Sequence, residues 1–173
     1  MRQIKFLLIP MIALFINACD NSSQPEDENN NLVYSTSFET ESDISGWSGL
    51  TKENLADAAC PDGKSHSLHI GGGCIQPAAS YEIPAVVPGK YKISFWGKMG
   101  QDSQSAGLSL KQVGNSSLMD SVNVQVTGTS WKYYESGKSL LVTSAAKLKL
   151  DVLVGGIIFA DVYIDNLKIV KID

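Results

Sequence analysis

The last strand-like segment of the chain, Val162–Val170, sets the strongest constraint on the fold. Apolar and polar residues alternate along it and many are β-branched, which predicts a strand with one face against a core. A carboxylate, Asp165, lies inside this segment, and an ionised group buried there needs a partner charge or a metal ion. The best partner candidate is far upstream, at Glu39. We therefore expect the first and last strands to pair and to bring Glu39 and Asp165 together around a cation.

Most of the chain between these two segments also divides into short strand-like runs separated by turn residues. Turns are indicated by pairs such as Pro88-Gly89 and Gly155-Gly156, and only Thr51–Ala59 favours a short helix. Strands are expected at Leu32–Glu39, Ser67–Gly71, Gln76–Ile83, Gly89–Lys98, Gly107–Val113, Ser117–Thr127, Trp131–Ser139, Ala146–Val154 and Tyr163–Lys171. Many short, evenly spaced strands predict an all-β sandwich or barrel.

The run Tyr91–Lys98 shows how these strands are expected to face. Tyr91, Ile93 and Phe95 share one side, whereas the polar residues and Trp96 share the other. One dry and one wet face per strand is what two packed antiparallel sheets require, so the prediction is an antiparallel β-sandwich.

Residues 1–18 resemble the signal sequence of a bacterial lipoprotein. A short basic start precedes an apolar run, Phe6–Ile16, that is too short to span a bilayer as a helix. The segment ending in Asn17-Ala18-Cys19 resembles a lipobox, in which Cys19 becomes the lipid-modified N-terminus after cleavage. Acyl chains on Cys19 would make the lipid membrane a partner. The alternative is an ordinary signal peptide in which Cys19 falls near the cut.

Residues 19–31 are polar and acidic and are expected to form a disordered tether, followed by one domain over residues 32–173. An acidic stretch after Cys19 resembles the surface-export signals of Bacteroidetes lipoproteins. In enteric bacteria, an Asp directly after the lipidated Cys instead marks inner-membrane retention. We expect the bacterial cell envelope, lipid-anchored at the outer membrane, with the leaflet left open.

Charge and cysteine usage limit the partners and the compartment. Without residues 1–18 the chain carries 12 basic and 18 acidic residues and no basic stripe, which argues against nucleic acid as a partner. Two cysteines remain besides Cys19, and in an exported protein Cys60 and Cys74 are expected to form a disulfide. The alternative is two buried free thiols.

Four landmarks line up in order along the proposed domain. They are Phe38-Glu39 before Gly46-Trp47, Gly63–Leu68, Pro88–Lys98, and Trp131–Tyr134 before Tyr163–Asn166. In order and spacing this set resembles the galactose-binding-like β-jelly rolls, and most closely the carbohydrate-binding modules of families four, nine and twenty-two. The resemblance implies a jelly-roll sandwich that binds carbohydrate.

The resemblance also implies a structural calcium ion near the paired termini. Its ligands would be the side chains of Glu39 and Asp165, with backbone oxygens around Ser37 and Lys64. Calcium accepts six to eight oxygens from separate segments, which agrees with this set. The alternative is that Glu39 pairs with a lysine and Asp165 caps a turn. The sequence departs from the family where a more common Asp-Asp is replaced by Asp165-Asn166.

Modules of this fold bind sugars on the open face of one sheet or at its loop edge, where aromatic rings pack on the C–H face of the sugar. Trp96 is the best candidate, because alternation places it opposite Phe95. Lys92, Lys98, Lys111 and Gln112 are expected to flank it on neighbouring strands. The alternative is that a loop covers Trp96, which would then be structural.

The remaining aromatic residues divide between core and surface. The resemblance assigns Trp47 and Trp131 to the core. Tyr133 and Tyr134 are neighbours on one strand, so one of the two is expected to be exposed.

No motif in the sequence supports catalysis. Glycoside hydrolysis needs two carboxylates in one cleft, and the only pair the predicted fold brings together, Glu39 and Asp165, is assigned to the cation. We therefore expect a glycan-binding domain that does not cleave its ligand. The alternative is a protein-interaction or structural module with a cell-envelope protein partner, because one fold serves many functions.

Overall fold

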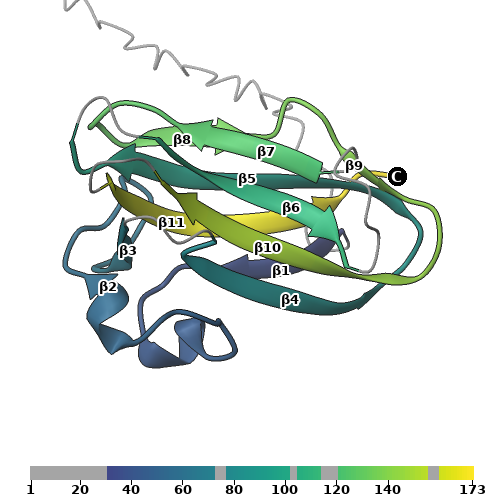
Figure 1. Cartoon of the computed structure of the whole chain (residues 1–173), viewed down its shortest axis with the longest axis horizontal. Helices are drawn as coiled ribbons and strands as arrows, with labels where there is room; N and C mark the ends of the chain where they lie inside the picture. The colour runs from purple at the N-terminus through teal and green to yellow at the C-terminus, as the bar shows by residue number, and fades with distance from the viewer. Residues whose placement is uncertain (1–30, 73–76, 102–104, 114–120, 156–159) are drawn as a thin grey trace, which may run out of the picture.

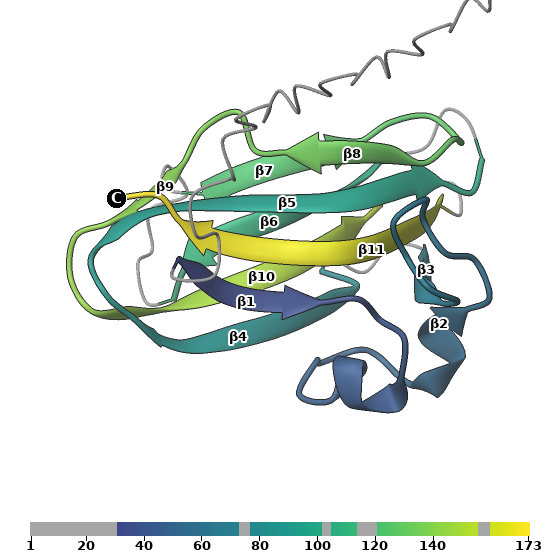
Figure 2. The ribbon, with the colours of Figure 1, turned by 180° about the vertical axis from the view of Figure 1, so that it is seen from behind.

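The computed structural model describes residues 31–72, 77–101, 105–113, 121–155 and 160–173. These residues form two antiparallel sheets packed face to face, which confirms the predicted all-β jelly-roll sandwich. Figure 1 looks onto the four-stranded sheet and Figure 2, from behind, onto the seven-stranded one. In the part of the chain described here, no helix is long and apolar enough to cross a membrane.

The larger sheet is built around the last strand. Its path is β2-β3-β11-β5-β8, with β1 also paired to β11 and β9 to β5. The strands are β1 (Leu32–Thr36), β2 (Leu55–Ala56), β3 (Ser67–Gly72), β5 (Gly89–Met99), β8 (Lys132–Glu135), β9 (Leu140–Val142) and β11 (Ala160–Lys171).

The smaller sheet has the order β4-β10-β6-β7. Its strands are β4 (Ala79–Val86), β10 (Ala146–Val154), β6 (Ala106–Gln112) and β7 (Ser121–Val126). Pro84 lies within β4, an edge strand, where a residue without an N–H group is tolerated.

The prediction of strands was more accurate than the prediction of a helix. Thr51–Ala59 is not an α-helix: a 3₁₀ turn over Lys52–Asn54 leads directly into β2. The backbone N–H of Thr51 donates to Asn54 Oδ1 at 2.9 Å, which caps the start of this turn, and the backbone becomes extended at Leu55. A second 3₁₀ turn, Glu41–Ile44, follows β1, and β9 was not predicted as a separate strand.

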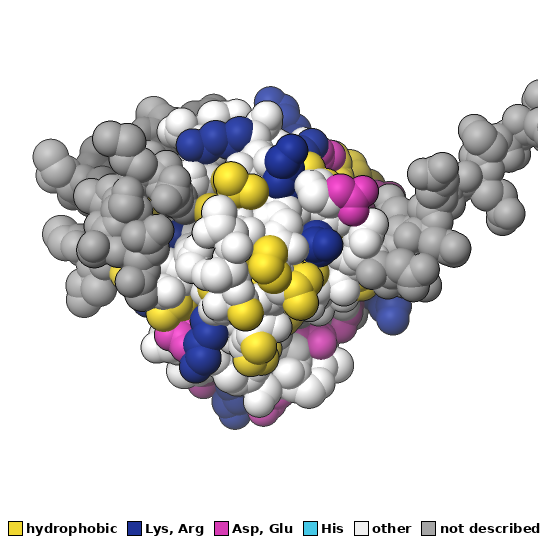
Figure 3. All heavy atoms as spheres, turned by 90° about the vertical axis from the view of Figure 1, so that its right-hand side faces the viewer, with side chains coloured by type: hydrophobic (Ala, Val, Ile, Leu, Met, Phe, Trp, Pro, Cys, Tyr) yellow, Lys and Arg dark blue, Asp and Glu magenta, His cyan; other side chains and the backbone are white. Residues whose placement is uncertain are grey.

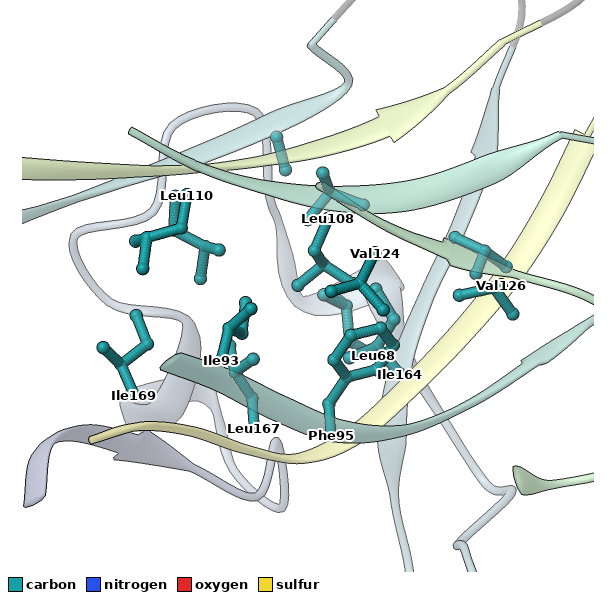
Figure 4. Packing of buried hydrophobic residues seen from close by; sticks show 14 of the residues in the cluster. Leu68, Ile93, Phe95, Leu108, Leu110, Val124, Val126, Ile164, Leu167 and Ile169 are labelled. Atoms are coloured by element: carbon teal, nitrogen blue, oxygen red, sulfur yellow. The ribbon is translucent and has the colours of Figure 1, made fainter. Parts of the chain in front are cut away.

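Alternation along the strands supplies the core between the sheets. In Figure 4 the inward side chains of the two sheets meet in the space between them. Those labelled are Leu68, Ile93, Phe95, Ile164, Leu167 and Ile169 from the larger sheet and Leu108, Leu110, Val124 and Val126 from the smaller one. All ten are buried, and each large side chain buried in this way contributes about 1.5–3 kcal/mol of transfer free energy.

The first and last strands pair, as predicted. β1 runs antiparallel to β11, with Thr36 opposite Leu167 and Tyr34 opposite Ile169. Glu39 follows β1 directly and therefore approaches the middle of β11, where Asp165 lies.

A β-bulge interrupts β11 beside Asp165. The pairing with β5 shifts between Asp165 and Lys168, and Asn166 has a left-handed backbone with φ of 45°. Ile164 and Leu167 are three residues apart, so in a regular strand their side chains would face opposite sides of the sheet. Both are nevertheless fully buried. The extra residue of the bulge allows both side chains to face the core while Asp165 faces the other side of the sheet.

Two adjacent leucines of β9 provide a test of this packing. Leu140 is 2% exposed and Leu141 is 58% exposed. We expect Leu140→Ala to lower the free energy of unfolding by about 2–5 kcal/mol. Leu141→Ala, the matched control, should change it by no more than about 0.5 kcal/mol. Urea unfolding of both variants measures the difference, and equal losses would contradict the described facing of β9.

Candidate functional site

The face of the larger sheet that points away from the core carries a pair of aromatic rings. Trp96 on β5 is half-buried there, and Tyr133 on β8 stands opposite it in the strand pairing. The two rings meet edge to face with centroids 6.0 Å apart, and Tyr133 is 56% exposed. The indole Nε1–H of Trp96 donates to Asp62 Oδ2 at 3.0 Å, so a loop fixes one edge of the ring without sealing it.

That loop, residues 57–66, lies over Asp165. The backbone N–H of Cys60 donates to Asp165 Oδ2 at 3.0 Å, and the N–H of Asn166 donates to Oδ1 at 2.7 Å. Gly63 permits this approach, because a Cβ there would lie 2.4 Å from Asp165 Oδ2. Asp165 is fully buried, and burial raises the pKa of its carboxyl group, although the hydrogen bonds from Cys60 and Asn166 oppose the rise.

Glu39 holds the other end of the same loop. Its carboxylate accepts hydrogen bonds from the backbone N–H groups of Lys64, Ser65 and His66 at 3.0–3.1 Å and from Ser65 Oγ at 2.9 Å. Desolvation by itself would raise the pKa of Glu39, but these hydrogen bonds outweigh it and lower the pKa to about 2. Glu39 is therefore ionised at neutral pH and clamps the loop.

These contacts bear on the predicted calcium site. Glu39 Oε2 accepts three hydrogen bonds from the loop and Oε1 accepts one, so the loop already binds both oxygens of the carboxylate. The described residues contain no group of three or more His, Cys, Asp or Glu side chains that could hold a metal ion. Calcium ligands at Ser37, Glu39, Lys64 and Asp165, two of them backbone oxygens, therefore stay a prediction. Backbone N–H groups of the loop already bind both carboxylates.

A pocket of about 280 Å³ lies beside the aromatic pair. Lys92 and Glu135 form an ion pair across β5 and β8 at this pocket, and Lys168 adds a cation from β11. Its lining residues all come from the outer face of the larger sheet and are Leu32, Lys92, Ser94, Tyr133, Glu135, Lys168, Val170 and Ile172. Lys92 thus lies on the same outer face as Trp96 and lines the pocket with Tyr133, whereas Glu135 and Lys168 were not anticipated.

A second aromatic group lies further along the same face. The ammonium group of Lys98 lies 5.0 Å from the ring centroid of Trp131 and 4.7 Å from that of Tyr163. Tyr163 also stacks on the His69 ring at 4.6 Å. The core assignment of Trp131 was therefore wrong: the side chain is half-buried outside the core. Alternation with the buried Ile164 could have revealed Tyr163, because it places Tyr163 on the outer face.

Lys111 and Gln112 do not flank Trp96. Both belong to β6, in the other sheet of the sandwich. Lys111 Nζ instead lies 2.6 Å from Oδ2 of the buried Asp151. The prediction placed them near Trp96 because consecutive strands were assumed to be neighbours, whereas in this topology β5 and β6 lie in different sheets.

The other assignments to core and surface can be judged directly. Trp47 is buried as expected, and its Nε1–H donates to the Tyr34 hydroxyl at 3.0 Å. Of the two adjacent tyrosines, Tyr133 is exposed, while Tyr134 is half-buried and its hydroxyl donates to the carbonyl of Thr127. These contacts confirm that one of the pair faces solvent.

The cysteine predictions fall partly outside the described residues. Cys60 is buried, and its Sγ accepts a weak hydrogen bond from Asn166 Nδ2 at 3.5 Å. Cys74 and Cys19 lie outside the described residues, so the disulfide and the lipid attachment stay predictions.

Comparison with known proteins places this fold among carbohydrate-binding modules. No family model matches the sequence. No curated protein matches it either. The CBM22-1 xylan-binding domain of Paenibacillus barcinonensis Xyn10C is 18% identical with a TM-score of 0.60, covering 83% of this chain and 96% of that one. The C-terminal family 22 module of Clostridium thermocellum Xyn10B is 18% identical with a TM-score of 0.56, covering 83% and 94%.

A third structure extends the likeness to another group of modules. The CBM36-1 domain of a multidomain xylanase from the hindgut metagenome of Trinervitermes trinervoides is 17% identical with a TM-score of 0.51, covering 81% of this chain and 98% of that one. The resemblance to the sandwich fold of carbohydrate-binding modules is confirmed.

Removal of calcium tests the role assigned to the loop. We expect the melting temperature in excess EDTA to stay within about 1 °C of its value in excess calcium, because backbone N–H groups already satisfy both carboxylates. A bound ion at a thousand times its Kd would add about 4 kcal/mol and raise the melting temperature by several degrees. Calorimetry in the two buffers measures the melting temperature. A calcium-dependent rise in melting temperature that Glu39→Gln abolishes would support a calcium ion at Glu39.

Proposed function

We propose that this domain binds a glycan chain on the outer face of the larger sheet and does not cleave it. The observation that carries the proposal is the exposed Tyr133 ring, which meets Trp96 edge to face beside a pocket with charged and hydroxyl groups. Aromatic rings paired with a few polar groups suit sugars, whose C–H faces are apolar and whose edges carry hydroxyls.

The parts of the site have separate roles in this proposal. The Tyr133 ring packs on the C–H face of a sugar. The Lys92–Glu135 ion pair offers donors and an acceptor to hydroxyl groups. Asp62 holds the indole of Trp96 in place by its hydrogen bond to Nε1. A rotamer fixed before binding lowers the entropy cost of association.

Binding without cleavage is supported by the carboxylates at the pocket. Among the described residues that line it, Glu135 is the one carboxylate, and it is paired with Lys92. Hydrolysis of a glycosidic bond in the usual way needs two carboxylates flanking the bond. Calcium at Glu39 and Asp165 has no part in the proposal.

The proposal also places the domain on a membrane of the bacterial cell envelope, through a lipid on Cys19. The support is the basic start, the short apolar run and the Ala18-Cys19 junction of the leader. The acidic residues 20–31 then separate the lipid from β1.

A binding assay with site variants tests the glycan proposal. We expect Tyr133→Ala and Trp96→Ala each to weaken binding about tenfold or more, because tenfold corresponds to about 1.4 kcal/mol and stacking on a ring supplies that amount. Gln125→Ala, an exposed change on the opposite sheet, is the matched control and should bind as the wild type does. Affinity electrophoresis can begin with xylan, since one protein of similar fold is described as xylan-binding. Equal binding by all variants, or none by the wild type to a polysaccharide panel, would contradict the proposal.

Replacement of the lipidated residue tests the anchor. We expect Cys19→Ser to move the protein from the membrane fraction to the soluble fraction and to abolish incorporation of labelled palmitate. Asn21→Ser, two residues away, keeps the thiol and should stay with the membrane. A Cys19→Ser protein that still incorporates palmitate would contradict lipid attachment at this residue.

A further inference from the structure

One end of the sandwich carries exposed apolar side chains. Val87 is 59% exposed and Leu141 is 58% exposed, and Leu32 and Ile172 are 38% and 37% exposed. Figure 3 looks at this end, and its apolar atoms gather near the middle of the described surface with lysines around them.

These residues are neighbours in the fold. Leu141 of β9 pairs with Lys90 of β5, and the backbone N–H of Ile172 donates to the Lys90 carbonyl at 2.7 Å. Val87 begins the turn into β5, and its carbonyl accepts a hydrogen bond from the Tyr91 hydroxyl. Leu141 and Ile172 therefore lie on the two sides of Lys90, and we call Leu32, Val87, Leu141 and Ile172 together the apolar end. Isolated exposed hydrophobic residues would need no explanation.

Lysines border the apolar end. Lys90 lies between Leu141 and Ile172, Lys171 precedes Ile172, and Lys138 lies two residues before β9. Asp173 is the acidic side chain next to Ile172. Apolar side chains among lysines fit a surface with an apolar interior and anionic head groups, since each basic residue near such a surface contributes about 1 kcal/mol.

The chain that leads to Cys19 joins the domain at this same end. The N–H of Lys171 donates to the Asn31 carbonyl at 2.8 Å, and Leu32 pairs with Val170. The 12 residues from Cys19 to Asn31 reach at most about 40 Å when fully extended. As a flexible coil they span roughly 20 Å. A lipid on Cys19 would hold the apolar end within this distance of the bilayer.

We propose that the apolar end docks on the bilayer that holds the N-terminal lipid, with Val87 and Leu141 at the lipid interface and the lysines on anionic phospholipid. This inference depends on the proposed lipid anchor. Leu32 and Ile172 also line the glycan pocket, so the test below changes only Val87 and Leu141, which do not. Lys98, Trp131 and Tyr163 lie towards the other end of β5 and β11, so docking directs them away from the membrane.

Vesicle binding tests the docking separately from the anchor. The mature chain from residue 19 onward, carrying Cys19→Ser, is sedimented with phosphatidylcholine vesicles that contain or lack phosphatidylglycerol. We expect binding to the anionic vesicles, and about a tenfold loss of affinity in Val87→Asp/Leu141→Asp. The matched control, Thr129→Asp/Ser130→Asp, adds the same charge to exposed residues next to Gly128, which bonds Met99 at the opposite end of β5, and should bind as the parent does.

The possible outcomes separate the explanations. Thermal unfolding of each variant confirms that it is folded, and glycan binding by Val87→Asp/Leu141→Asp should equal that of the parent. No binding of the parent to anionic vesicles, or an equal loss in the Thr129/Ser130 control, would overturn the proposal. A concentration-dependent dimer that Val87→Asp/Leu141→Asp abolishes would assign the apolar end to a second copy of the chain and would also overturn it.

Discussion

The hydrogen bonds that the loop of residues 57–66 donates to Glu39 and Asp165 determine the shape of the outer face of the larger sheet. Glu39 receives three backbone N–H groups and one hydroxyl, and Asp165 receives the N–H of Cys60. Hydrogen bonds to charged acceptors are roughly twice as strong as neutral ones. The loop held in this way brings Asp62 to Trp96, so the position of the indole depends on carboxylates that never touch it.

The two sides of the larger sheet have different roles. One side packs on the smaller sheet and supplies the stability, while the other side carries the proposed glycan site. Because Tyr133, Lys92 and Glu135 are not part of the core, they can change without disturbing its packing. This separation explains how one sandwich can host different binding surfaces, and why the argument for function has to come from the site itself.

Local patterns in the sequence predicted what depends on local geometry. Alternation predicted most of the strands and the outward facing of Trp96. The pairing of β1 with β11 was predicted instead from the need of the buried Asp165 for a distant partner. It could not show which strands share a sheet, and for that reason Lys111 was placed beside Trp96 although it belongs to the opposite sheet. The backbone N–H groups that bind Glu39 carry no side-chain signature, so the sequence alone could not reveal them.

The bulge at Asn166 has a consequence for how the domain could vary. Opposite Phe95 the strand β11 contains two residues where a regular strand would contain one. Asn166 is the additional one, and its side chain donates to the carbonyl of Asp62 at 3.1 Å. In a chain that lacks Asn166, β11 would pair with β5 without interruption and keep the same inner and outer faces. The hydrogen bond from Asn166 to the loop would be lost. A deletion at this one position could therefore change the outer face of the larger sheet without changing the fold.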